Sequence, residues 1–347
     1  MAKENQGRLA YADVLRVMAT LAVIVIHLTG AWVESLDPST GNWMVCNLYN
    51  SLSRWAVPVF VMLSGMFLLD PDRPMDPKRL LRHMLRLGVA LAVWGMVYAL
   101  REQIRKTGLT PAAVAAAAED VFRGRTSFHL WFIYMMLGLY LVTPVLRAFL
   151  RGAEKRDLHY FFLLYALLNL FLPSFLLFRP SQVIRVHLTM TYLSTGTLQY
   201  VGYYVAGYYL MRYPPDGKLR TLLLSLGLLG GVITAAGTAC IPAARERLLL
   251  YVYYAPNVAA MTVGVFVLVQ SAAPKIRGRW WGALSQVTFG IYLVHLEIIR
   301  LLEQFGLNSM TVPPLFGVPL LAAAVFLGSL AVVWPLSKLP GIGRYLT

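Results

Sequence analysis

Long apolar stretches recur along the chain and are separated by short segments that hold most of its charge. A run of about 20 apolar residues is long enough to cross a bilayer as a helix. The pattern therefore predicts an all-α polytopic membrane protein in which residues 1–347 form one bundle of about ten transmembrane helices. The windows fall at residues 9–33, 43–69, 80–101, 128–150, 158–178, 197–212, 219–240, 250–270, 281–302 and 314–337.

Composition supports this fold class. Hydrophobic residues make up 58% of the chain and charged residues 14%, whereas soluble domains average about 45–50% and about 25%. The net charge of +15 is better explained by loops that face anionic membrane lipids than by binding of nucleic acid. Cys46 and Cys240 lack the spacing of a metal site, so no metal is expected, and a disulfide between them stays open.

The loops are too short to contain a soluble catalytic domain, so chemistry is expected inside the bundle or at its mouths. In the longest loop, 102–127, Thr110 can cap a short helix that Pro111 begins. The first window is expected to be retained rather than cleaved as a signal peptide, because Asp13 and Arg16 lie inside it. The sequence does not indicate an oligomeric state.

The distribution of basic residues predicts the orientation. They favour one side of the membrane by about two to one, and the positive-inside rule places that side, with both termini, in the cytoplasm. The loop residues assigned to this side are Lys3, Arg8, Arg73, Lys78, Arg79, Arg82, Arg86, Arg147, Arg151, Lys155, Arg156, Arg212, Lys218, Arg220, Lys275, Arg277, Arg279, Lys338 and Arg344. Those on the other side are Arg101, Arg105, Lys106, Arg123, Arg125, Arg179, Arg185, Arg245 and Arg247.

Polar residues form a stripe on the first window. Asp13, Arg16, Thr20 and His27 are spaced so that they share one face of a helix. An ion at the bilayer centre costs about 2.5–3.5 kcal/mol on insertion scales, so the stripe should face other helices or a wet cavity. Asp13 can pair with Arg16 one turn away. A hydrogen bond that locks two helices is the alternative explanation for His27.

The second window carries a similar face, formed by Asn47, Asn50, Ser51 and Arg54. Pro58 leaves a main-chain carbonyl without its helical partner and predicts an interruption nearby. The first helix runs outward and the second inward, so Arg54 and His27 are expected at a similar depth. Snorkelling of Arg54 to the outer surface is the alternative.

Further polar side chains are predicted at the outer mouth. They are His129, Tyr200, Tyr204, Asn257 and His295. Each also has an ordinary structural explanation: an interfacial position for His129, a core hydrogen bond for His295, packing for the tyrosines and a helix contact for Asn257.

Basic residues gather at the start of the third window, in MDPKRLLRHMLRL. Asp76 is expected to cap a helix that Pro77 begins. The face that follows can contact lipid phosphates, or it can dock a phosphate-rich soluble ligand. Its members are Arg79, Arg82, His83 and Arg86.

Taken together, these motifs resemble the integral-membrane acyltransferase-3 family. The resemblance covers almost the whole chain. It rests on Arg16 followed eleven positions later by His27, and on NSLSRWAVPVFVMLSG, HLWFIYMMLGLYLVTPVL, TLQYVGYYVAGYYL and FGIYLVHLEII. It implies that the chain transfers an acyl group, usually acetyl from the co-substrate acetyl-CoA, to a hydroxyl of an extracytoplasmic or lipid-linked glycan at the bacterial inner membrane.

The resemblance also implies residue roles. His27 matches the histidine regarded as catalytic in the family, and Arg16 and Arg54 match its functional arginines. Larger relatives with a fused hydrolase-like domain carry a glutamate where this chain has Met136. A mechanism that needs that glutamate does not carry over to this chain.

The expected mechanism uses a water-accessible passage through the bundle. Acetyl-CoA would bind its phosphates at Arg79, Arg82 and Arg86 and pass its thioester arm along Arg16, which Asp13 orients. His27 would act as the general base or take the acetyl group itself, and Arg54 would stabilise the oxyanion. The sugar would be received by His129, Tyr200, Tyr204, Asn257 and His295.

A secondary transporter of a small anionic or sugar-like solute is the alternative function. Ten helices with intramembrane ions and proline kinks also suit alternating access around a central site. Such carriers often contain inverted repeats, and no repeat is found in this sequence. Acetyl transfer by the purified protein distinguishes the two.

Overall fold

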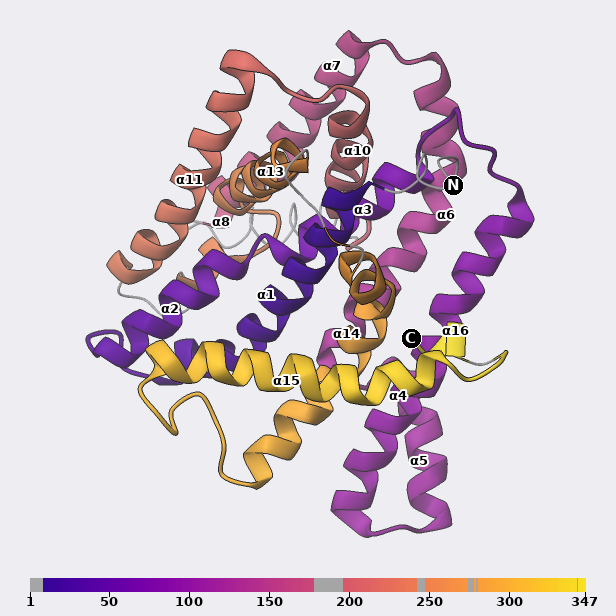
Figure 1. Ribbon diagram of the computed structural model, residues 1–347, viewed down its shortest axis with the longest axis vertical. Coiled ribbons are helices and arrows are strands. Elements are labelled where there is room, and N and C mark those ends of the chain that lie inside the picture. The colour runs from indigo at the N-terminus through magenta and orange to yellow at the C-terminus, as the bar shows by residue number, and fades with distance from the viewer. Residues whose placement is uncertain (1–8, 178–195, 242–246, 274–277, 279, 342) are drawn as a thin grey trace.

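The computed structural model describes residues 9–177, 196–241, 247–273, 278, 280–341 and 343–347, and this part of the chain folds without a strand (Figure 1). The predicted all-α class is confirmed. The helices are α1 (Ala10–Ser35), α2 (Gly41–Ser53), α3 (Ala56–Leu68), α4 (Pro77–Thr107), α5 (Pro111–Phe122), α6 (Trp131–Gly152), α7 (Lys155–Tyr165), α8 (Leu172–Leu177), α10 (Leu198–Arg212), α11 (Gly217–Cys240), α13 (Pro256–Ser271), α14 (Trp280–Gln304), α15 (Pro314–Ser337) and α16 (Gly343–Leu346). Shorter elements are the 3-10 turns η1 (Phe128–Leu130) and η4 (Leu248–Tyr251) and the π-helical segment η2 (Ala166–Phe171).

Within the described residues, nine segments are long and apolar enough to cross a membrane, as in a multi-pass membrane protein. The window at 197–212 does form a helix, α10, but its 15 residues fall short of the roughly 20 that cross a bilayer. The nine candidates over this part of the chain are consistent with the predicted bundle of about ten helices. Eight basic residues used for the orientation lie outside the described residues, namely Lys3, Arg8, Arg179, Arg185, Arg245, Lys275, Arg277 and Arg279.

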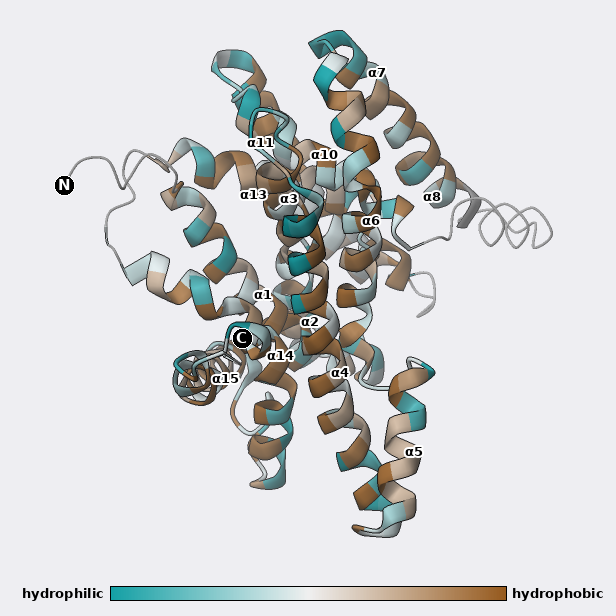
Figure 2. Ribbon diagram, turned by 90° about the vertical axis from the view of Figure 1, so that its right-hand side faces the viewer, coloured by the Kyte–Doolittle hydropathy of each residue, from teal (hydrophilic) through white to brown (hydrophobic). Residues whose placement is uncertain are grey.

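Helix α1 lies at the centre of the bundle, where α2, α3, α13, α14 and α15 pack around it (Figure 1). Its buried side chains occur on several faces, as expected for a helix enclosed by others. Hydrophobic positions dominate the middle of the surrounding helices, and hydrophilic positions gather toward ends such as the start of α7 and of α11 (Figure 2). The polar stripe of α1 therefore faces protein.

Helices α2 and α3 belong to one apolar segment that is interrupted at Arg54 and Trp55. Pro58 has no N–H, so the carbonyl of Arg54 loses its usual helical partner. The interruption predicted near Pro58 is confirmed. It places the Arg54 side chain at the junction of the two helices.

The predicted helix starts are also confirmed. A side-chain oxygen of Asp76 accepts a hydrogen bond from the N–H of Lys78 at 3.1 Å, and Pro77 opens α4. Thr110 accepts one from the N–H of Ala113 at 3.1 Å. The resulting helix α5 packs beside the end of α4 (Figure 1).

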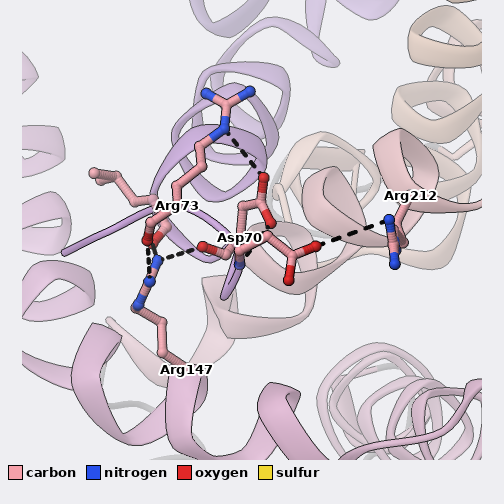
Figure 3. A network of polar contacts seen from close by, with 6 residues as sticks. Asp70, Arg73, Arg147 and Arg212 are labelled. Carbon is pink, nitrogen blue, oxygen red and sulfur yellow. Dashed lines mark hydrogen bonds and ion pairs between the residues drawn. The ribbon is translucent and has the colours of Figure 1, made fainter.

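Arg147 of α6 holds the loop between α3 and α4 (Figure 3). Its guanidinium donates to the carbonyls of Leu68 at 2.8 Å, Asp70 at 2.6 Å and Arg73 at 2.6 Å. Carbonyls at the end of a helix have no partner within it, and here the guanidinium supplies one. The assignment of Arg147 to a loop is wrong, because α6 continues to Gly152 and the side chain is only 4% exposed.

Helices α3 and α10 cross at two glycines. A Cβ atom on Gly65 would lie 1.8 Å from the carbonyl oxygen of Tyr204, and one on Gly207 would lie 1.8 Å from that of Met62. Each glycine therefore faces the backbone of the opposite helix. Neither position has room for a methyl group.

The two cysteines are not joined. Cys46 is buried and Cys240 is exposed, and both thiols are free. The disulfide left open by the sequence is therefore absent between these two described residues.

Candidate functional site

A cavity of about 560 Å³ opens between α1, α3, α4, α6 and α14. One end is polar and cationic, and the other is walled mainly by apolar and aromatic side chains. The polar groups that line the cavity include Asp13, Arg16, His83, Arg86, Tyr140 and Ser285. The deep end is bounded by Val23, Val57, Phe132, Met136 and Tyr292. We call this space the large cavity.

Arg16 stands on the wall of the large cavity and is held by neighbours from α1 and α14. Its guanidinium lies 3.5 Å from a carboxylate oxygen of Asp13 and 3.4 Å from the hydroxyl of Ser285. It also lies over the ring of Phe67, at 5.1 Å from the centroid. The pairing of Asp13 with Arg16 that the spacing predicted is therefore present.

The basic face of α4 divides into two groups. His83 and Arg86 are half-buried and line the large cavity, and Arg86 donates to the carbonyl of Thr347 at 2.5 Å. Arg79 and Arg82 lie nearer the start of the helix, are exposed and do not line the cavity. The four residues thus form a cationic rim that extends outward from the cavity.

Three histidines from α1, η1 and α14 meet beyond the deep end of the large cavity. The ring centroid of His295 lies 5.1 Å from that of His27 and 5.5 Å from that of His129. Tyr292 joins α14 to η1, because its hydroxyl donates to the carbonyl of His129 at 2.5 Å. The expectation that these histidines lie at the same level is confirmed. We call them the histidine cluster.

A pair of aromatic rings separates the histidine cluster from the large cavity. Phe132 and Tyr292 have centroids 5.6 Å apart, and Tyr292 lies 6.0 Å from His295. His27 borders a second, small cavity of about 70 Å³. Among the described residues the two cavities share no lining residue. The predicted passage is therefore closed in this structure, because the ring of Tyr292 packs between Phe132 and His295.

Arg54 lies close enough to His27 to interact with it electrostatically. Asn50 connects the two helices, since its amide N–H groups donate to Thr29 at 2.8 Å and to Ile26 at 3.3 Å while its oxygen accepts from Arg54 at 2.8 Å. The guanidinium also stacks on Tyr251 at 4.4 Å from the centroid. No carboxylate of the described residues lies within ion-pair distance of Arg54, although Glu34 interacts with it at longer range and Tyr253 forms a hydrogen bond with it.

Three residues predicted at the outer mouth make contacts with neighbouring helices or turns in this structure. Tyr204 bonds through its hydroxyl to Thr143 at 2.9 Å, and Tyr200 packs its ring 5.7 Å from that of Trp131. The amide of Asn257 donates to Thr234 and to the carbonyl of Leu250, each at 2.8 Å. None of the three lines either cavity.

The structure adds residues that the sequence analysis did not select. Ser285 and Tyr292 lie on one face of α14 with His295, and the cavity is also lined by Thr288 and Phe289 of that face. These residues could have been found from the sequence, because their helical spacing places them on the same face as His295. Tyr140 and Tyr251 carried no such signal, because each comes from another helix or turn, where Tyr140 contacts the ring of His83 and Tyr251 contacts Arg54.

The comparison with known families agrees with this site. The sequence profile of the acyltransferase-3 family, described as an acyltransferase domain, matches residues 9–338. No curated protein and no solved structure matches the chain significantly. The matched residues include every helix that lines the two cavities and all three members of the histidine cluster. The chain therefore belongs to the acyltransferase-3 family of membrane acyltransferases.

Proposed function

We propose that this protein is an O-acetyltransferase that moves an acetyl group from cytoplasmic acetyl-CoA to a hydroxyl of an extracytoplasmic or lipid-linked glycan. Family membership supplies the acyltransferase activity. The observation that carries the finer proposal is a large cavity with a cationic rim at one end and His27 with its cluster beyond the other. This arrangement suits a donor that is anionic at one end and reactive at the other.

The cationic rim is the proposed binding site for the phosphates of acetyl-CoA. Guanidinium groups bind phosphate through charge-assisted hydrogen bonds, and often in a bidentate manner. Arg86 would contact the part of the donor that enters the large cavity, and the exposed Arg79 and Arg82 would contact phosphates that stay outside. The pantetheine arm would then pass Arg16 toward the deep end.

The chemistry is acyl transfer with His27 as general base. A ring nitrogen of His27 removes the proton of the acceptor hydroxyl while that oxygen attacks the thioester carbonyl. The C–S bond then breaks, and the imidazolium returns the proton to the thiolate of coenzyme A. Arg54 provides positive charge for the oxyanion that forms in between. Trapping of an acetylated His27 would instead assign it the role of a nucleophile.

Access to His27 requires the aromatic pair to open. Phe132 and Tyr292 close the deep end in this structure. Rotation of these side chains would connect the thioester to the small cavity, from which the acceptor would arrive. Closure in the absence of donor would also limit hydrolysis of the thioester by water.

We keep His129 and His295 as the proposed neighbours of the acceptor, and we propose that Tyr200, Tyr204 and Asn257 act in helix packing, which their contacts support. Within the family, we extend the proposal to an activity like that of the inner-membrane enzyme that O-acetylates enterobacterial common antigen, whose motifs those of this chain resemble. That polysaccharide is our specific proposal for the acceptor. The orientation that follows places the cationic rim and both termini in the cytoplasm.

The test is acetyl transfer by the detergent-purified protein, with radiolabelled acetyl-CoA and isolated glycan. We expect transfer by the wild type, none by His27→Ala, and normal transfer by His159→Ala, a matched control at an exposed histidine bonded to Tyr209. A folded His27→Ala variant with full activity would refute the mechanism. Solute flux in vesicles without thioester turnover would favour the transporter.

A further inference from the structure

One nitrogen of the His295 ring is committed to its own helix. Nδ1 lies 2.6 Å from the carbonyl oxygen of Tyr292. A carbonyl can only accept, so the proton of this hydrogen bond must be on Nδ1. In the neutral imidazole the other nitrogen, Nε2, then carries a lone pair and acts as an acceptor.

The acceptor nitrogen of His295 has no partner. Nε2 is buried and forms no hydrogen bond with the described residues. Nε2 lies on the side of the ring opposite the Nδ1 hydrogen bond to Tyr292. The imidazoles of the histidine cluster are its neighbours there, with His27 at 5.1 Å and His129 at 5.5 Å between centroids. A buried acceptor without a donor is costly, so a donor is expected to approach it.

The separation from His27 fits a hydrogen bond between two imidazoles. An N–H···N bond of about 2.9 Å places the ring centroids about 5 Å apart, because each nitrogen lies about 1.2 Å from its centroid. The two rings are tilted by only 35°, whereas His129 meets His295 edge-on at 87°. The bond requires a nitrogen of His27 to face Nε2 of His295, and the second side-chain torsion of His27 has a broad range for this adjustment.

His129 is less suited to the same role. Its Nδ1 lies 2.8 Å from the hydroxyl of Ser127, which can donate or accept. The position of its proton is therefore not fixed by its partner. The carbonyl of Tyr292, by contrast, fixes the tautomer of His295.

We propose that His295 is the positioning residue for His27: its Nε2 accepts the N–H of His27 and so leaves the opposite nitrogen of His27 with a free lone pair. This rests on the proposed function, in which that nitrogen removes the proton of the acceptor hydroxyl. When His27 becomes protonated, its original N–H stays bonded to His295 and the new N–H is on the opposite nitrogen. The transferred proton still passes from the hydroxyl through His27 to the thiolate of coenzyme A, so His295 gains and loses none.

The kinetic test compares two replacements of His295. His295→Gln can present an amide oxygen near the position of Nε2, whereas His295→Phe fills the ring volume without an acceptor. We expect His295→Phe to lower kcat by about 100-fold with the KM for acetyl-CoA unchanged, because the tautomer of a catalytic base is worth factors of this order or more. We expect His295→Gln to recover at least a tenth of wild-type kcat. Equal losses in both variants, or activity of His295→Phe within threefold of wild type, would overturn the proposal.

A second measurement does not depend on activity. Nitrogen-15 NMR of the full chain in lipid nanodiscs, with His27 assigned by comparison with His27→Ala, reports which ring nitrogen carries the proton. We expect one neutral tautomer of His27 in the wild type and in His295→Gln, and a mixture in His295→Phe. A mixture in the wild type contradicts the positioning role. If the wild type transfers no acetyl group, the proposed function fails, and the NMR result still decides this inference.

Discussion

The clearest energetic prediction concerns Arg147 and the loop between α3 and α4. Arg147→Met keeps much of the apolar stem and removes three hydrogen bonds, of 2.8, 2.6 and 2.6 Å, to main-chain carbonyls. A hydrogen bond to a charged group contributes about 1.5–3 kcal/mol. The loop is partly exposed and its carbonyls can regain water. We therefore expect a loss of about 3–4 kcal/mol in the free energy of unfolding, less than the full sum.

The assay is thermal unfolding of the purified protein, followed by intrinsic fluorescence, beside Arg151→Met as the matched control. Arg151 is one turn further along α6 and is exposed. We expect the melting temperature to fall by about 4–6 °C for Arg147→Met and to stay within about 1 °C for Arg151→Met. Equal melting temperatures for the two variants would show that the hydrogen bonds from the Arg147 guanidinium to these carbonyls do not stabilise the fold.

Three further predictions follow from contacts described above. Gly207→Ala should destabilise the fold by more than about 3 kcal/mol because a main-chain oxygen cannot move aside, whereas Gly88→Ala, with open space around it, should be neutral or stabilising in the same melting assay. Arg86→Ala should raise the KM for acetyl-CoA about 10-fold in steady-state kinetics, whereas substitution of the exposed Lys78 by Ala should leave it unchanged. The same KM for both variants would contradict binding of the donor at Arg86. Arg54→Lys should lower kcat by about 10–100-fold with little change in KM, since lysine keeps the charge but not the geometry; a change confined to KM would contradict a role at the oxyanion.

The sequence predicted the features that depend on local pattern. Apolar windows, the caps at Asp76 and Thr110, and the interruption near Pro58 all follow from short-range chemistry. The stripe on α1 also predicted that Asp13 meets Arg16, because the spacing of residues on one helix fixes which side chains are neighbours.

Features that depend on how helices pack against one another were not predictable from one sequence. Tyr204 has the same local pattern as a mouth residue, but the crossing of α3 and α10 at Gly65 and Gly207 turns it toward Thr143. Arg147 was assigned to a loop because its own segment gives no sign of its partners. These partners are three main-chain carbonyls at the end of α3 and in the loop after it. The separation between the two cavities likewise depends on the side-chain rotamer of Tyr292. The order of polar and apolar residues in the sequence does not predict this rotamer.

The shell around Arg54 has a consequence for how the protein responds to acidity. Its direct contacts are an amide oxygen, a main-chain carbonyl, the face of the Tyr251 ring and the hydroxyl of Tyr253, and none of these gains a proton in mildly acidic surroundings. A guanidinium paired with a carboxylate would see its field strengthen as the acid became protonated. Here no carboxylate is in direct contact, so within this shell the imidazoles are the groups that titrate in that range, and the more distant Glu34 is an acid that still acts on the charge of Arg54.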